Sequence, residues 1–216
     1  MFEKYNLTKP DNLVDLFEQS VKMYPDRPCL GTKNRDGEYE WITYREMGRR
    51  IDNLRGGLAA MGLKKGDAVG IIANNCVDWA VGHFAVAGIN AMYVPMYEAE
   101  LVHVWEYIIR DSAVKILFVS KPEIYEKVRD FPSKINTLEK IYLLRGDGEN
   151  TMTTLERIGE KNPVEAVHPA PEDVAVLVYT SGTTGDPKGV LLMHGNWTSN
   201  HHARVVAYPN FNPDDR

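Results

Sequence analysis

The stretch Tyr179–Gly189, YTSGTTGDPKG, packs four small hydroxyl residues, three glycines and one lysine into eleven positions. It lies between two apolar runs, Val174–Tyr179 and Val190–Met193, and each run is typical of a β-strand. Glycines and small hydroxyl residues let a backbone approach a polyanion closely and turn several N–H groups toward it. Lys188 adds a positive charge where the terminal phosphates would lie. The pattern therefore predicts a loop that cradles a triphosphate.

Other glycine-rich motifs do not fit this stretch. A Walker A loop needs Gly-Lys-Ser/Thr followed by a helix, whereas Lys188 stands between Pro187 and Gly189 and leads into an apolar run. The pattern G-x-G-x-x-G occurs nowhere in the chain. The structural alternative is a plain hairpin tip, where Gly, Thr, Ser, Asp and Pro are all common. The density and order of these residues favour the phosphate loop.

Upstream of the loop, short apolar runs alternate with helical patterns. Strands are expected at Ala68–Ala73, Ala91–Met96, Lys115–Ser120 and Lys140–Leu144, and helices at Val77–Gly88, Ala99–Asp111 and Pro122–Asp130. Alternation at these lengths is typical of parallel βαβ units. The sequence predicts an α/β fold whose sheet is covered by helices on both faces.

The N-terminal part carries helix and hairpin signals. Asn12 is a possible cap for a helix with apolar residues from Leu13 to Tyr24. A hairpin turn is expected at Asn34–Gly37. Thr43–Glu46 is a capping box, and Gly62 fits the C′ position of the helix that follows it.

Three prolines in the segment 162–173 predict a linker or long surface connection. It divides the chain into an α/β subdomain (residues 1–161) and a phosphate-loop segment (174–216). The end of the chain, 209–216, is polar and typical of a turn. We therefore expect residues 1–216 to be the N-terminal portion of a larger domain in a longer protein.

Composition excludes several function classes. Lys and Arg total 25 against 30 Asp and Glu, so the general basic footprint of a nucleic-acid-binding protein is absent. Cys29 and Cys76 lack a metal-like spacing, which favours free thiols in a reducing compartment. No apolar run approaches ~18 residues, and the N-terminus lacks a signal-peptide core. These features predict a cytoplasmic protein and leave peripheral membrane contact open.

The Tyr179–Gly189 stretch resembles the signature phosphate loop of the acyl-adenylate-forming enzymes, which include acyl-CoA synthetases, luciferases and amino-acid adenylation domains. The aromatic residue, the Thr-Ser-Gly-Thr-Thr-Gly core and the Pro-Lys-Gly end all match, and His194-Gly-Asn196 follows where that family often carries a His and an Asn. Segments Tyr39–Tyr44, Leu63–Gly70 and Val94–Glu98 are similar to early parts of acyl-CoA synthetases. The Val-Pro-Met-Tyr-Glu and Thr-Gly-Asp-Pro-Lys-Gly variants look most like the long-chain fatty acid branch.

The resemblance implies the N-terminal part of the adenylate-forming enzyme fold, with mixed and parallel sheets covered by helices and without the C-terminal lid domain. It also implies the reaction. A carboxylate attacks the α-phosphorus of ATP to give an acyl-adenylate and pyrophosphate, and the thiol of coenzyme A then displaces AMP. The expected partners are therefore small molecules, namely a medium- or long-chain fatty acid, ATP and coenzyme A.

The resemblance assigns roles within the loop. Lys188 and Thr184 are the expected catalytic residues, and Thr184 is the hydroxyl expected nearest Mg²⁺, with Thr183 next to it. The β- and γ-phosphates of ATP would be held by hydroxyls, backbone N–H groups and the lysine charge, from Thr180, Ser181, Gly182, Thr183, Thr184, Gly185 and Lys188.

Parts that the family reaction requires are missing from the chain. There is no later acidic residue to share Mg²⁺, no acidic ribose ligand, no adenine-stacking segment and no C-terminal lysine. We expect residues 1–216 alone to make no acyl-adenylate. An aryl- or amino-acid-activating ligase of the same family and a non-catalytic nucleotide-binding module remain open alternatives.

Other polar residues have simpler interpretations. His201 and His202 are adjacent, so on a helix their side chains point about 100° apart and a metal pair is improbable. For His194, a structural or pocket-lining role is favoured over that of a catalytic base. Four arginines on one helix predict a solvated basic face, with contact to coenzyme A phosphates as the less favoured alternative: Arg45, Arg49, Arg50 and Arg55.

Overall fold

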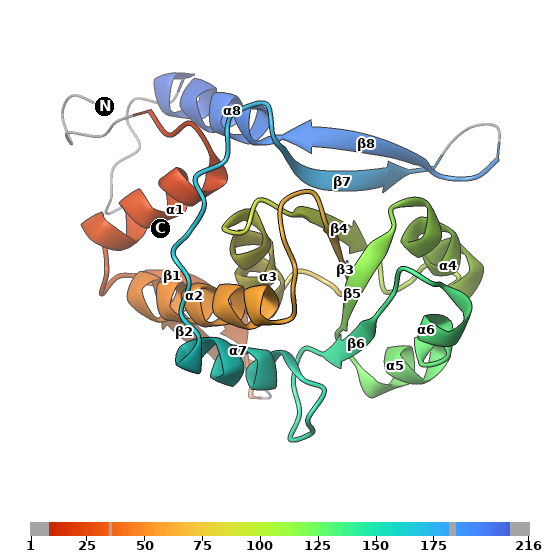
Figure 1. The fold of residues 1–216 in the computed structure, drawn as a ribbon. Helices are drawn as coiled ribbons and strands as arrows, with labels where there is room; N and C mark the ends of the chain where they lie inside the picture. Colours follow the sequence, from red (N-terminus) through yellow and green to blue (C-terminus); the bar gives the residue numbers. More distant parts are fainter. Residues whose placement is uncertain (1–8, 35, 182–184, 208–216) are drawn as a thin grey trace.

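The computed structural model describes residues 9–34, 36–181 and 185–207. Figure 1 shows its helices and strands, whose bounds in chain order are α1 (Leu13–Met23), β1 (Pro28–Lys33), β2 (Tyr39–Thr43), α2 (Tyr44–Ala60), β3 (Ala68–Ile72), α3 (Val77–Ala87), β4 (Met92–Met96), α4 (Val102–Asp111), β5 (Val114–Val119), α5 (Pro122–Val128), α6 (Phe131–Lys134), β6 (Lys140–Leu143), α7 (Met152–Lys161), β7 (Val174–Thr180), β8 (Lys188–Met193) and α8 (His194–Ala207). Among these described helices, none combines the length and the apolar character needed to cross a membrane.

The main sheet has six strands in the order β6-β5-β3-β4-β7-β8. Neighbouring strands from β6 to β7 are parallel, whereas β8 runs antiparallel to β7. A separate two-stranded sheet pairs β1 with β2. The predicted α/β fold with parallel βαβ units is confirmed, and β8 makes the sheet mixed.

Helices cover both faces of the main sheet (Figure 1). On one face, α2 and α3 pack on the strands through buried residues such as Leu54 and Val81, and α1 packs on these two helices through Phe17. On the other face, α4, α5 and α6 contribute a second buried cluster that includes Ile109 and Val128. Strands buried on both sides explain why β3, and β5 after Lys115, are continuous apolar runs without alternation.

The N-terminal signals are confirmed in detail. The side chain of Asn12 accepts a hydrogen bond from the backbone of Asp15 at the start of α1. Thr43 and Glu46 form the complete capping box of α2. Gly62 has a φ of +84°, the left-handed conformation that follows a helix end and favours glycine.

Helix α7 was not predicted, although it makes the closest helix pair of the described structure. A Cβ on Gly159 would lie 1.7 Å from the carbonyl oxygen of Asn53 in α2, and a Cβ on Gly57 would lie 2.2 Å from that of Leu155. The two backbones are therefore in direct contact. The apolar stripe of α7 is short because glycine replaces a large residue at the crossing.

The prediction of a solvated arginine face on α2 is wrong for two of its four members. Arg50 lies 2.8 Å from Asp78 and 2.6 Å from Glu156. Arg55 is buried, and its Nε donates to the carbonyl oxygen of Val164. Burial alone lowers the pKa of Arg50, but its two carboxylate partners outweigh this effect and raise it. Both side chains hold neighbouring segments in place.

The segment 162–173 crosses the surface without regular secondary structure and leads to β7. It is attached along its length, since the N–H of Val167 donates to the carbonyl oxygen of Gly88 at 2.8 Å. At its end, Asp173 accepts from Lys65 at 2.7 Å and from Asn90 at 2.8 Å. These bonds lower the pKa of Asp173 to about 2. They fix the point at which the chain enters β7.

Candidate functional site

The glycine-rich stretch connects β7 to β8 across an antiparallel hairpin. Thr180 and Lys188 are cross-strand partners, and so are Tyr179 and Gly189. The plain hairpin considered as the alternative to a phosphate loop is thus present, but a hairpin can also bind phosphate. It places the residues that enter and leave the loop side by side.

Four of the seven predicted phosphate-binding residues lie in the described structure. Thr180, Ser181, Gly185 and Lys188 are all exposed, in the loop or where it joins β7 and β8. Gly185 has a φ of +132°, which suits glycine. The other three, Gly182, Thr183 and Thr184, lie outside the described residues, and with them the hydroxyl predicted nearest Mg²⁺.

The charges and hydrogen-bond donors where the loop joins β7 and β8 suit an anionic ligand. Within the described part of the chain, the ammonium group of Lys188 makes no ion pair. The hydroxyls of Thr180 and Ser181 stand across from it, on the strand that enters the loop. A cation opposite exposed hydroxyl donors can bind phosphate oxygens without first giving up a protein partner.

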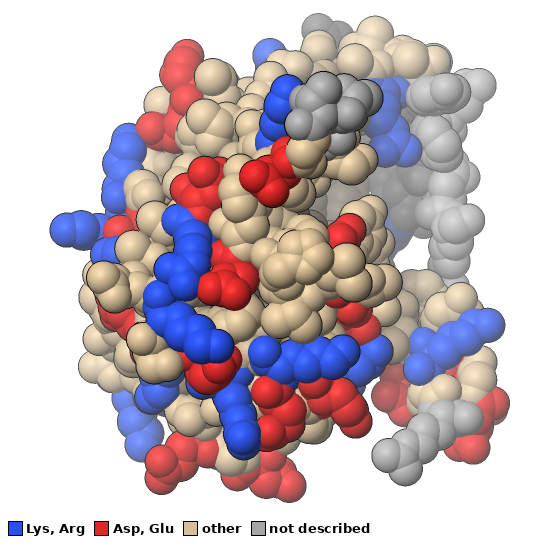
Figure 2. Space-filling model, turned by 90° about the vertical axis from the view of Figure 1, so that its right-hand side faces the viewer, with Lys and Arg blue, Asp and Glu red and all other residues tan. Residues whose placement is uncertain are grey.

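A cleft of about 500 Å³ opens beside the hairpin, where the parallel strands β3 and β4 end. This carboxyl edge of a parallel sheet is the usual ligand position in α/β folds. Its lining includes the apolar residues Trp79, Pro95, Met96, Val104, Ile108 and Val178. It also includes Thr180, Ser181, Gly185 and Asp186 from the loop and its entry. The space-filling view of the face with α4 and the hairpin tip shows acidic and basic side chains interspersed (Figure 2).

A carboxylate fixes the strand ends beneath the cleft. Glu98 Oε1 accepts from the backbone N–H of Asn74 at 2.9 Å and from Ser120 Oγ at 2.7 Å. Its other oxygen pairs with Lys121 Nζ at 2.5 Å. Partial burial opposes ionisation of Glu98, but the hydrogen bonds from Lys121 and Ser120 outweigh it and lower the pKa. The residues that follow β3, β4 and β5 are thereby joined.

The residues of the loop suit Mg²⁺ by donor type. Thr180, Ser181 and Asp186 supply hydroxyl and carboxylate oxygens, the ligands that this hard cation prefers. No group of three or more His, Cys, Asp or Glu side chains elsewhere in the described ranges is arranged to hold a metal ion. His201 and His202 lie in α8, away from the loop.

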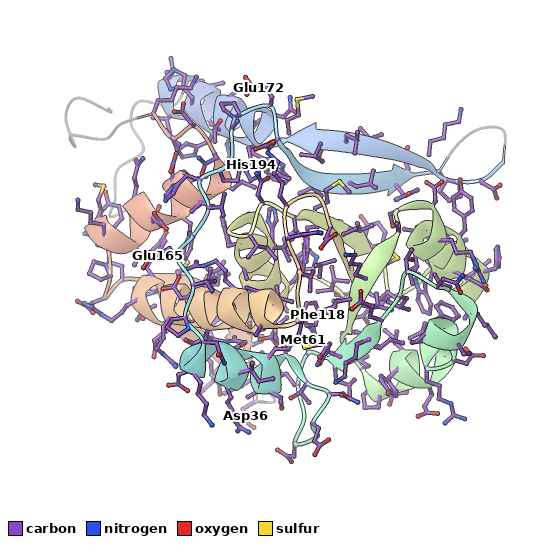
Figure 3. The ribbon with its side chains drawn as sticks, in the orientation of Figure 1. Asp36, Met61, Phe118, Glu165, Glu172 and His194 are labelled. Atoms are coloured by element: carbon purple, nitrogen blue, oxygen red, sulfur yellow. The ribbon has the colours of Figure 1, made fainter. Side chains whose placement is uncertain are left out.

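His194 lies inside the molecule and away from the cleft. It begins α8 and points between that helix, α1 and α3 (Figure 3). Its Nδ1 accepts from the backbone N–H of Leu13 at 3.3 Å, which joins α8 to α1. Burial lowers its pKa to about 4. The structure therefore gives His194 a structural position.

His83 is a second buried histidine in the same region. Its ring stacks on Tyr93 with 5.5 Å between ring centroids. Burial, and then the nearby His194, lower its pKa to about 4. Neither His83 Nε2 nor His194 Nε2 finds a hydrogen-bond partner among the described residues. Both rings are neutral near pH 7.

Sequence reasoning assigned no role to one pair beside the loop, Tyr179 and Asp111. The Tyr179 hydroxyl donates to Asp111 Oδ2 at 2.5 Å. These residues are 68 positions apart, so only the fold brings them together. The sequence signals were that each stands at the end of an expected element, a strand for Tyr179 and a helix for Asp111, and that Tyr179 is the aromatic residue of the loop motif.

Comparison with known proteins supplies a family. A family model described as AMP-binding enzyme matches residues 17–216. Fatty acyl-CoA synthetase A of Dictyostelium discoideum is 32% identical over 193 residues, which cover 82% of this chain and 27% of that protein. Human long-chain-fatty-acid–CoA ligase 1 is 29% identical over 217 residues, covering 92% of this chain and 31% of the ligase. The chain thus spans about three tenths of the length of these relatives.

Solved structures agree with the fold. A long-chain-fatty-acid-CoA ligase from Archaeoglobus fulgidus superposes with a TM-score of 0.80 at 27% identity, covering 94% of this chain and 41% of that one. An anthranilate CoA ligase solved with anthranoyl-AMP superposes with a TM-score of 0.75 at 25% identity, covering 88% of this chain and 36% of that one.

Proposed function

The chain belongs to the AMP-binding enzyme family, and from this premise we propose that it supplies the phosphate loop of a fatty acid–CoA ligase. The ligase would be a longer protein that activates a medium- or long-chain fatty acid with ATP and transfers it to coenzyme A. The observation that carries the proposal is the place where the loop joins β7 and β8. There, Thr180, Ser181 and Lys188 lie together beside a largely apolar cleft.

In the proposed reaction, the main task of the protein is to stabilise negative charge. When a carboxylate attacks the α-phosphorus of ATP, negative charge develops on the departing pyrophosphate. Lys188 would hold the terminal phosphates by charge, and the hydroxyls of Thr180 and Ser181 would donate to their oxygens. Mg²⁺, when bound, would neutralise phosphate charge next to the oxygens of Ser181, Thr184 and Asp186.

Long-chain fatty acids are the proposed substrates because the relatives with the names reported above are fatty acyl-CoA synthetases. An aryl acid is the second candidate, since the chain also superposes on an anthranilate CoA ligase. A cytoplasmic location is part of the same proposal and rests on composition alone.

Identification of the thioester product tests the proposal. The longer protein is incubated with ATP, Mg²⁺, coenzyme A and an equimolar panel of fatty, aryl and amino acids, and mass spectrometry detects the acyl-CoA formed. We expect long-chain acyl-CoA, together with one AMP per thioester. A product from aryl or amino acids alone would replace the fatty acid assignment. ATP binding without any product would indicate a non-catalytic nucleotide-binding module.

A further inference from the structure

The ring of Tyr179 occupies a slot that the hairpin leaves open for it. Tyr179 faces Gly189 across the two strands, and a Cβ on Gly189 would lie 3.3 Å from Tyr179 Cζ and 2.9 Å from a methyl carbon of Leu177. Glycine at this position lets the aromatic ring lie across the neighbouring strand. The ring is half-buried and packs against the cluster formed with α4.

Helix α4 presents two residues to this ring. Tyr107 meets it edge-on, with 6.4 Å between centroids and 87° between ring planes. Asp111, four positions later and therefore on the same face of the helix, accepts the hydrogen bond from the Tyr179 hydroxyl at 2.5 Å. The strand that enters the phosphate loop is thus attached to α4 by a hydrogen bond and a ring contact.

The hydrogen bond from Tyr179 stabilises the Asp111 carboxylate at an unfavourable position in α4. Asp111 is the last residue of α4, where the negative end of the helix dipole disfavours a carboxylate. A donor that meets the carboxylate offsets this effect. Burial, followed by the bond to Asp111 and its charge, raises the pKa of Tyr179 well above its ordinary value. The phenol therefore keeps its proton and remains the donor at all ordinary pH values.

The same helix also faces the residues that leave the loop. Tyr107, Ile108, Tyr179 and Asp186 line one cleft, so α4 stands beside both arms of the hairpin. Loss of solvent, followed by the charges of Asp111 and Asp186, raises the pKa of Tyr107. Helix α4 is the rigid element nearest the loop on this side.

We propose that Tyr179 and Asp111 are positioning residues for the phosphate loop, and that their hydrogen bond fixes the direction in which the chain leaves β7 at Thr180. This inference rests on the proposed function of the loop. The bond would hold the hydroxyls of Thr180 and Ser181 at a set distance from Lys188, so that ATP binds to a loop whose entry is already ordered. Neither side chain needs to touch the nucleotide.

The substitution Tyr179→Phe tests this role because it removes the hydroxyl and keeps the ring over Gly189. In acid-dependent ATP–pyrophosphate exchange by the longer protein, we expect KM for ATP to rise about tenfold, the value of one hydrogen bond to a charged group. KM for the acid should stay within about twofold of wild type. Tyr125→Phe, in α5, is the matched control because the Tyr125 hydroxyl makes no described hydrogen bond, and it should leave both values unchanged.

Variants of the acceptor separate positioning from a general loss of structure. Asp111→Asn keeps an acceptor oxygen for the phenol and should retain most ATP affinity. Asp111→Ala should behave like Tyr179→Phe, and the double variant should be no worse than either single variant, because all three lack the same bond. If Tyr179→Phe matches Tyr125→Phe in KM for ATP, the positioning role is wrong while the proposed function stands.

Amide hydrogen exchange provides a readout that does not depend on activity. In Tyr179→Phe, we expect faster exchange in residues 178–181 and 186–190 and unchanged exchange in β3 and β5. If the wild-type protein shows no acid-dependent pyrophosphate exchange, the proposed function fails, and these exchange rates still decide the inference. Equal protection of the hairpin in both proteins would overturn it.

Discussion

Lys188 lies opposite Thr180, where the loop joins the two strands of the hairpin. It is exposed and has no ion-pair partner among the described residues. A lysine in that position is available for phosphate oxygens. We predict that Lys188→Ala lowers kcat/KM for acid-dependent ATP–pyrophosphate exchange by about 10²–10³ because charge stabilisation in the transition state is lost. Lys161→Ala, at the exposed end of α7, is the control and should keep wild-type kinetics. Equal activity of the two variants would remove Lys188 from the site.

The buried histidines His83 and His194 predict a pH dependence of stability. Their pKa values in the folded chain lie near 4, below the ordinary value of 6.5. Between these values the unfolded chain binds protons that the folded chain excludes. Their contribution is therefore complete above about pH 6.5 and decreases as the pH falls toward 4. The expected loss is roughly 2–3 kcal/mol per histidine.

Urea denaturation from pH 7 to pH 4.5 measures this effect. His194→Asn keeps an oxygen that can accept from the N–H of Leu13 but removes the titrating ring, so the loss should be about half that of wild type. His103→Asn, exposed on α4, should show the full wild-type loss. Asp173, with a pKa of about 2, loses its contribution only at lower pH and does not interfere. An unchanged pH dependence in His194→Asn would contradict the assignment.

At the level of elements, the close contact between α2 and α7 predicts how Gly159→Ala changes the stability of the protein. Helix propensity alone predicts that Gly159→Ala stabilises the protein by about 1 kcal/mol. The structure predicts the opposite sign, because the new Cβ would lie 1.7 Å from the Asn53 oxygen. We expect a loss of about 3 kcal/mol in the free energy of unfolding. Denaturant titration decides between the two.

Gly148→Ala is the control for this contact. A Cβ at Gly148 meets nothing within 4 Å, so its effect should stay within about 0.5 kcal/mol. If both variants have the same stability, the helices do not pack as closely as described.

The elements also show which features a sequence can predict. The β3–α3–β4–α4–β5 alternation was predictable because buried parallel strands are continuous apolar runs and the helices between them carry a 3.6-residue period. The caps at Asn12 and Thr43 were predictable because capping is local. Helix α7 was not, since its packing depends on Gly57 and Gly159, which are a hundred positions apart in the chain. The Tyr179–Asp111 bond likewise depends on contact between segments that are 68 positions apart.

For the candidate site, the order and composition of Tyr179–Gly189 were enough to predict the family, whereas phosphate binding by this loop stays a prediction. The family resemblance predicted on these residues is confirmed by the family model over residues 17–216. The positions of His194 and Arg50 were not predictable, because burial and the partners Leu13, Asp78 and Glu156 decide them. The roles of Thr183 and Thr184 stay predictions, since both lie outside the described residues.

At the scale of the whole molecule, the chain carries the proposed phosphate loop between β7 and β8, and it spans 27–31% of the length of two curated relatives. Groups that would bind adenine, ribose and the attacking carboxylate are not supplied by the described hairpin. We therefore predict that residues 1–216 alone form no acyl-adenylate, although they can bind a triphosphate weakly through Lys188. Isothermal titration with ATP and adenosine, compared between wild type and Lys188→Ala, measures that binding.

The central claim is that Tyr179–Gly189 is the phosphate loop of an enzyme that adenylates a fatty acid. Its most direct test is the incorporation of labelled pyrophosphate into ATP by the longer protein, with and without a long-chain fatty acid. The account predicts exchange that requires the acid and is lost in Lys188→Ala but not in Lys161→Ala. Exchange that ignores the acid, or no exchange with any carboxylic acid, would contradict it.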